Sequence, residues 1–197
     1  MICQVCKYNT NAPYGLLQPL PIPTRVWEEI SMDFIEGLPK SLGKEVIWVV
    51  MDRVSKYAHF VALVHPYSAE TVAQAYMDNI FRLHGLPKSI VNNRDTIFLS
   101  TFWQSLFTTL WVDLHLSSAY HPQFDGQTKV VNRRLEQYLR CMCIQAPKKW
   151  LKWLPLAEYW YNTSFHSATQ YTPFEVLYNQ PPPYTFLIYL AKLPIPQ

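Results

Sequence analysis

Three positions stand out for the chemistry of their side chains and for their spacing. Asp33 is a carboxylate inside a run of apolar residues, an unusual place for an acid in a core strand. Asn93 follows a second short apolar segment, and Lys129 comes after a further 35 residues, 94–128. Carboxylates are the side chains with which proteins hold magnesium, so Asp33 is the only charged metal ligand among the three.

Around these positions several short segments occur in a fixed order that together resembles one known family. The resemblance is to the integrase core of gypsy-type LTR retrotransposons, a branch of the retroviral integrase superfamily, and it covers residues 3–183. Each segment is a weak signal alone, but their order and spacing make the set specific. The segments are Cys3–Lys7, Leu16–Pro23, Ser31–Phe34, Asp52–Lys56, Leu83–Pro87, Ala119–Gln123, Asp125–Thr128, Trp160–Asn162 and Thr172–Phe174.

The resemblance implies a catalytic site at these three positions. In the family an Asp, a second Asp and, 35 residues later, a Glu hold two divalent metals for DNA end processing and strand transfer. Here Asp33 is retained, while Asn93 and Lys129 replace the second and third carboxylates. Two metal ions about 3.5–4 Å apart need several carboxylates to offset their repulsion. We therefore expect weak or absent Mg²⁺ or Mn²⁺ binding and a catalytically defective copy.

Other interpretations stay open at this stage. Asp33 could be a polar strand residue with no metal role, and Asp95, Asp125 or Glu136 could replace the lost ligands. The chain could then be an active nuclease or transferase. It could also be a non-catalytic DNA-binding or interaction protein that a host has recruited and that keeps the integrase fold. Whether it is an enzyme is therefore not decided by the sequence.

A basic flank on one predicted helix is the candidate DNA-binding surface. It consists of Lys129, Arg133, Arg134 and Arg140. The family places this helix against DNA, and contact with phosphates would be sequence-tolerant and salt-sensitive. A solvated helix face is the competing interpretation, because a net charge of +3 permits nucleic-acid binding without demanding it.

The ends of the chain differ from its middle. Residues 1–23 are interpreted as a remnant of the family's zinc-binding region followed by a Pro-rich linker, 24–179 as the integrase core, and 180–197 as a Pro-rich tail. Cys3 and Cys6 have zinc-ligand spacing, but the His pair that completes the family's site is missing, so zinc binding is not expected.

Composition excludes several classes of protein. In 197 residues, 49% are apolar, which supports a packed core and argues against disorder. No apolar run is long enough for a signal peptide or a membrane span, so an intracellular protein is expected. The family implies a nuclear location, DNA as the partner and self-association.

Hydrophobic periodicity predicts how these residues are positioned. Strands are predicted at 27–35, 46–51, 58–64, 89–92 and 113–116, and helices at 68–84, 100–110, 127–144, 150–161 and 173–178. The first three strands can form an antiparallel meander, and the later ones, joined by helices, can lie parallel. This pattern indicates an α/β protein with a mixed five-stranded sheet flanked by helices, and the resemblance implies an RNase H-like fold of three layers.

One turn carries a conformational expectation. Trp111 stands between a predicted helix and a predicted strand, where the family has Gly. Gly would permit a positive φ at this point, so we expect Trp111 to strain the turn.

Overall fold

Five strands and nine helical segments make up the computed structural model, which describes residues 25–92, 96–116 and 126–183. The strands are β1 (Glu29–Ile35), β2 (Val46–Asp52), β3 (Ala58–Leu63), β4 (Ser89–Asn92) and β5 (Asp113–Leu116). The helical segments are α1 (Ala69–Tyr76), η2 (Met77–Phe81), α2 (Arg82–His84), α3 (Thr96–Leu99), α4 (Thr101–Thr109), α5 (Gly126–Met142), η3 (Pro147–Lys149), α6 (Trp150–Thr163) and α7 (Pro173–Tyr178).

The strands form one mixed sheet in the order β3-β2-β1-β4-β5. β1, β2 and β3 pair antiparallel, while β4 lies parallel to β1 and β5 parallel to β4. Parallel neighbours need a crossover connection, and the helical segments before β4 and β5 supply it. The predicted meander and the predicted parallel strands are both confirmed.

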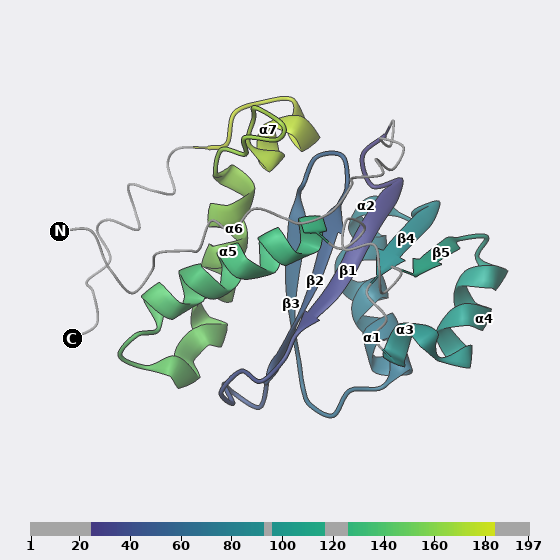
Figure 1. Cartoon of the computed structure of the whole chain (residues 1–197), viewed down its shortest axis with the longest axis horizontal. Coiled ribbons are helices and arrows are strands. Elements are labelled where there is room, and N and C mark those ends of the chain that lie inside the picture. Colours follow the sequence, from purple (N-terminus) through teal and green to yellow (C-terminus); the bar gives the residue numbers. More distant parts are fainter. Residues whose placement is uncertain (1–24, 93–95, 117–125, 184–197) are drawn as a thin grey trace.

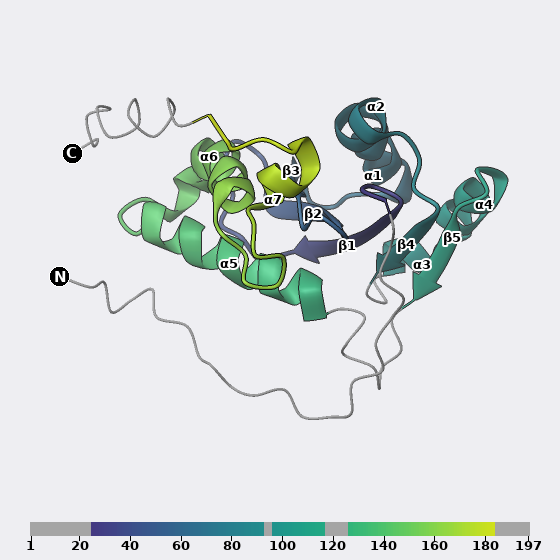
Figure 2. The ribbon, with the colours of Figure 1, turned by 90° about the horizontal axis from the view of Figure 1, so that it is seen from above.

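Helices cover both faces of this sheet (Figures 1 and 2). Side chains alternate between faces along a strand, so each strand contributes to two cores. Trp48 of β2 packs with α1, η2 and α4, whereas its neighbours Ile47 and Val49 pack with α5 and α6. All seven residues of β2 are buried, as expected for a strand with helices on each side.

The helical run before β4 begins as predicted but is not one regular helix. The Ser68 hydroxyl caps its start by accepting the Thr71 N–H at 3.3 Å, and Gly85 ends it with φ 76°. The predicted continuous helix over 68–84 is wrong in its middle, because residues 77–81 form a π-helical turn. Apolar periodicity over so short a stretch cannot separate the two forms.

A buried acid fixes the turn between β2 and β3 to the start of β1. Asp52 is fully buried and accepts the N–H of Trp27 at 2.8 Å and the N–H of Ser55 at 2.7 Å. The Ser55 hydroxyl adds a third bond to the same carboxylate at 2.5 Å. This gives the segment Asp52–Lys56 a structural role, because it anchors the strand that carries Asp33.

Side chains from α6 cover the outer edge of β3. Asn162 accepts the N–H of Ala58 at 2.9 Å and donates to the carbonyl of the same residue at 2.8 Å. Glu158 accepts the N–H of Phe60 at 2.7 Å. An exposed strand edge leaves backbone groups unpaired, and these two side chains satisfy them here. The segment Trp160–Asn162 therefore contributes to closing the sheet.

The expected strain at Trp111 is confirmed. Its φ is 57°, a left-handed conformation that residues other than Gly rarely adopt, and the residue is 92% exposed. The unfavourable backbone conformation is therefore not offset by packing of the side chain.

In the described part of the chain, no helix is long and apolar enough to cross a membrane.

Candidate active site and basic face

Asp33 lies in the middle of β1 with its carboxylate in the layer between the sheet and α5. Its Cα pairs with that of Val49 on β2, and on the other side Met32 pairs with Asn92, the last residue of β4. Alternation along β1 puts Asp33 on the same face as Ile35, which packs against α5 and α6. The side chain is only 5% exposed, so its charge needs partners inside the protein.

Protein groups donate to both carboxylate oxygens of Asp33. The N–H of Phe34 donates to Oδ1 at 2.9 Å, and the side-chain amide of Asn132 on α5 donates to Oδ2 at 2.7 Å. Within the described part of the chain, the buried Oδ1 atom of Asn132 has no hydrogen-bond partner. These two bonds satisfy acceptor sites of a carboxylate that is almost fully buried.

Lys129 lies one helical turn before Asn132 on α5. Residues three apart on a helix are neighbours on its surface, so the lysine stands next to the residue that contacts Asp33. It is exposed, while Thr128 before it is buried. α5 packs on the face of the sheet toward which Asp33 points (Figure 1).

Asn93, the remaining position of the predicted site, lies outside the described residues, as do Cys3, Cys6, Asp95 and Asp125. β4 ends at Asn92, whose buried side chain has no hydrogen-bond partner among the described residues. The prediction that residue 93 completes the site stays a prediction.

The described residues of this site do not suit a pair of divalent cations. Asp33 supplies one carboxylate, whose oxygens are already bonded, and the nearby α5 positions supply an amide and an ammonium. Within residues 25–92, 96–116 and 126–183, no group of three or more His, Cys, Asp or Glu side chains is placed to hold a metal. Glu136 lies one turn beyond Asn132, at the rim of a pocket. No catalytic step through a metal can be derived from these residues.

Asn132 is the partner that the sequence analysis missed. An amide in a helix has no chemical signature of its own, so Asn132 is not among the site residues predicted from the sequence. Its spacing of three from Lys129 would have placed it on the same side of the helix. A buried acid predicted in a neighbouring strand then requires a donor, which is the signal that could have identified it.

The four basic residues assigned to α5 do not share one face. Lys129, Arg133 and Arg140 are exposed and recur at i, i+4 and i+11, which aligns them along one side of the helix. Glu136 at i+7 interrupts this stripe with a negative charge. Arg134 points elsewhere and is half-buried, because its Nη1 donates to His166 Nε2 at 3.0 Å. We call Lys129, Arg133 and Arg140 the basic stripe.

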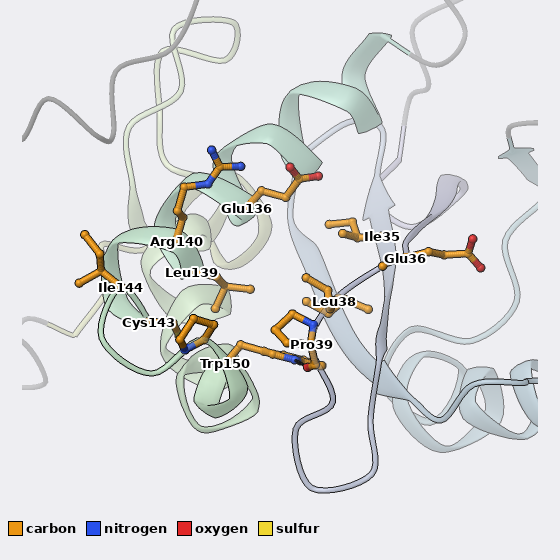
Figure 3. Close-up of a pocket in the computed structure, with 13 residues that line it drawn as sticks. Ile35, Glu36, Leu38, Pro39, Glu136, Leu139, Arg140, Cys143, Ile144 and Trp150 are labelled. Carbon is orange, nitrogen blue, oxygen red and sulfur yellow. Dashed lines mark hydrogen bonds between the residues drawn. The ribbon is translucent and has the colours of Figure 1, made fainter.

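A mostly apolar pocket of about 450 Å³ lies beside the stripe (Figure 3). Its lining comes mainly from the end of β1 with its following loop, the second half of α5, and the start of α6. Glu136 and Arg140 project from α5 at its rim, whereas Glu36 points away. The floor includes Trp150, whose indole N–H donates to the carbonyl of Pro39 at 2.7 Å.

Comparison with known proteins gives a sequence relationship over almost the whole chain. No protein-family model matches it. Over 180 residues, or 91% of its length, it is 39% identical to the transposon Tf2-3 and Tf2-4 polyproteins of Schizosaccharomyces pombe (strain 972 / ATCC 24843). The chain spans only 14% of the length of those polyproteins.

Three solved structures of viral proteins share the fold of this chain. A simian T-cell lymphotropic virus intasome in complex with PP2A regulatory subunit B56 gamma matches with a TM-score of 0.67 at 18% identity, covering 92% of this chain and 65% of that one. The HTLV-2 integrase catalytic core domain in complex with magnesium (trimeric form) gives 0.59 at 16%, covering 77% and 96%. The catalytic core domain of BIV integrase gives 0.60 at 19%, covering 78% and 95%. The predicted RNase H-like fold is confirmed.

Proposed function

Because this chain is an integrase catalytic core of the retrotransposon type, we propose that it belongs to the DNA-integration machinery of a transposon, binds DNA through the basic stripe, and has lost metal-dependent chemistry. The observation that carries the proposal is the bond from Asn132 to Asp33 beside Lys129. It supports a site in which the remaining acid is held by the protein and the third ligand position is an amine.

The charges at the three site positions disfavour the binding of two divalent cations. The family's three carboxylates carry −3, whereas Asp33, Asn93 and Lys129 carry −1, 0 and +1, which sum to 0. At 4 Å two unit charges interact by about 4 kcal/mol at an effective dielectric of 20, and a divalent cation doubles the repulsion from a lysine. The lysine stem can swing away, but this restores no ligand.

The catalytic part of the proposal is tested by restoring the two positions. Purified chain is incubated with labelled double-stranded DNA ends and Mg²⁺ or Mn²⁺, and no nicking or strand joining is expected. Asn93→Asp combined with Lys129→Glu should recover metal-dependent cleavage, and either change alone should recover little. Adding Asp33→Ala to the double variant is the control and should abolish the recovered activity. Metal-dependent cleavage by the unmodified chain that disappears in Asp33→Ala would contradict the proposal.

The DNA-binding part is tested separately from catalysis. The exposed cations of the basic stripe should contact phosphates, so affinity should fall steeply with salt. In fluorescence-anisotropy titrations at low salt, Lys129→Gln with Arg133→Gln should weaken binding about equally for different DNA sequences. Arg82→Gln on α2, an exposed arginine in the opposite layer, is the matched control and should change little. An absence of binding at low salt would refute this part.

A place in the integration machinery of a transposon also implies self-association and a nuclear location, and we propose both for this chain. A solved neighbour is described as a trimeric form and another as an intasome. We propose that this core also forms multimers on DNA, and light scattering with and without a DNA duplex measures it. A mass equal to one chain under both conditions would rule out multimers.

A further inference from the structure

Two histidines from different elements meet at the edge of the sheet farthest from β5. His59 lies on β3 and His84 is the last residue of α2, and their Nε2 atoms are 2.9 Å apart. Glu158 of α6 contacts His59 Nδ1 at 3.0 Å. The indole of Trp27 stacks on the His84 ring, with centroids 3.6 Å apart and an interplanar angle of 7°. These contacts link α6, β3, α2 and the turn before β1.

The protons in this chain of contacts can be assigned from the partners. A carboxylate only accepts hydrogen bonds, so Nδ1 of His59 carries the hydrogen that faces Glu158. A neutral His59 then presents the lone pair of Nε2, and the hydrogen between the two rings belongs to Nε2 of His84. The pair is therefore well bonded when both rings are neutral.

We propose that the His59–His84 contact is a proton-operated clasp that holds α2 against β3 when the rings are neutral and opens when both are charged. If both rings are protonated, each Nε2 carries a hydrogen, and two donors with like charges face each other without an acceptor. The stacked Trp27 ring leaves His84 little room to turn away.

The groups around the pair support this dependence on pH. Glu158 faces it from α6, and Tyr57, just before β3, lies with its ring centroid 5.4 Å from that of His59. Tyr178 of α7 contacts Tyr57 in turn. Burial raises the pKa of Tyr57, so this phenol stays neutral in acid. Of the described residues in contact with the pair, Glu158 is the only acid.

The direction of the effect follows from His84. Burial, and then the neighbouring His59, lower the pKa of His84 to about 4 from the ordinary 6.5. Between these values an opened clasp takes up a proton that the closed clasp does not. The contribution of the clasp is therefore fully present above pH 6.5 and is lost as the pH falls toward 4.

Hydrogen exchange of the full chain tests the clasp locally. The exchange rates of peptides covering 58–63 and 82–86, corrected for the intrinsic effect of pH, should be roughly five- to tenfold higher at pH 5.0 than at pH 7.5. This expected increase is smaller than the pKa shift of a fully buried ring would give, because the His84 ring is partly exposed to solvent. In His84→Gln the amide can still bond to His59 but does not titrate, so the rise should disappear. His166→Gln removes a different buried histidine and should keep it.

Two results would overturn the clasp. One is equal protection of these peptides in the unmodified chain at both pH values, and the other is an unchanged rise in His84→Gln. If His84→Gln does not fold, NMR titration of the His84 ring in the unmodified chain replaces it. Titration of that ring near 6.5 would also overturn the proposal.

Discussion

Arg134 on α5 donates from Nη1 to Nε2 of His166 at 3.0 Å, so the buried imidazole must be unprotonated at that nitrogen. Burial, followed by the charge of Arg134, lowers the pKa of His166 to about 4, and a backbone hydrogen bond to Tyr161 acts in the opposite direction. The contact ties the segment after α6 to α5. Arg134 is thereby a structural residue more than a candidate for phosphate contact.

Replacing His166 with Gln should reduce the sensitivity of the chain to acid. As the pH falls below 6.5, the unfolded chain binds a proton at residue 166 that the folded chain does not, so the free energy of unfolding decreases toward pH 4. We expect the loss between pH 7 and 4.5 to be about 1 kcal/mol smaller in His166→Gln, after allowance for solvent screening. Urea unfolding at several pH values measures this. His65→Gln, at an exposed position, is the control, and equal pH dependence in all three proteins would contradict the assignment.

Asn132→Ala should destabilise the fold, because it removes the donor to Oδ2 of a buried carboxylate. Leaving a buried acceptor without its partner costs about 1–3 kcal/mol. Arg133→Ala, at the exposed neighbouring position, should stay within about 0.5 kcal/mol of the unmodified chain. Chemical denaturation compares the two variants. Similar free energies of unfolding for both would show that the bond from Asn132 to Asp33 does not contribute to stability.

Trp111→Gly should stabilise the chain by about 0.5–1 kcal/mol. The gain comes from relief of a left-handed conformation, less the larger entropy of Gly in the unfolded chain. Because the residue is 92% exposed, little packing is lost. Trp111→Ala keeps a Cβ at positive φ and should change stability little, so the difference between the variants isolates the backbone. A less stable Gly variant would argue against strain at this turn.

Glu136→Lys should extend the basic stripe and steepen the salt dependence of DNA binding. One added phosphate contact changes the slope of log affinity against log salt by about 0.9. Asp78→Lys makes the same charge change at an exposed position on η2, in the opposite layer, and should leave the slope nearly as it was. The slopes come from anisotropy titrations over a range of salt. Equal slopes for the two variants would place the DNA on another surface.

The elements could be predicted from the sequence because their signals are local. The buried run of β2, the Ser68 cap, the stop at Gly85 and the apolar face of α5 each depend on neighbours in sequence. The positive φ of Trp111 could be anticipated because a Gly is expected at a turn of this kind. The parallel placement of β4 followed from the helices that must precede it.

The contacts that define the site could not be predicted in this way. Asn132 and Asp33 are 99 positions apart, and a buried acid indicates that a donor is needed without indicating which residue supplies it. The pairing of Arg134 with His166 depends on how the segment after α6 returns to α5. Helical spacing already separates Arg134 from Lys129, Arg133 and Arg140, but only the packed structure shows that it contacts His166.

The side chains of α6 that cover β3 limit how copies of this chain can join. Addition of a strand from a second copy would need free N–H and C=O groups along the margin of the sheet. At Ala58 and Phe60 these groups are already bonded to Asn162 and Glu158. A ribbon of sheets running through several molecules is therefore blocked at this point, and multimers must join there through side-chain surfaces.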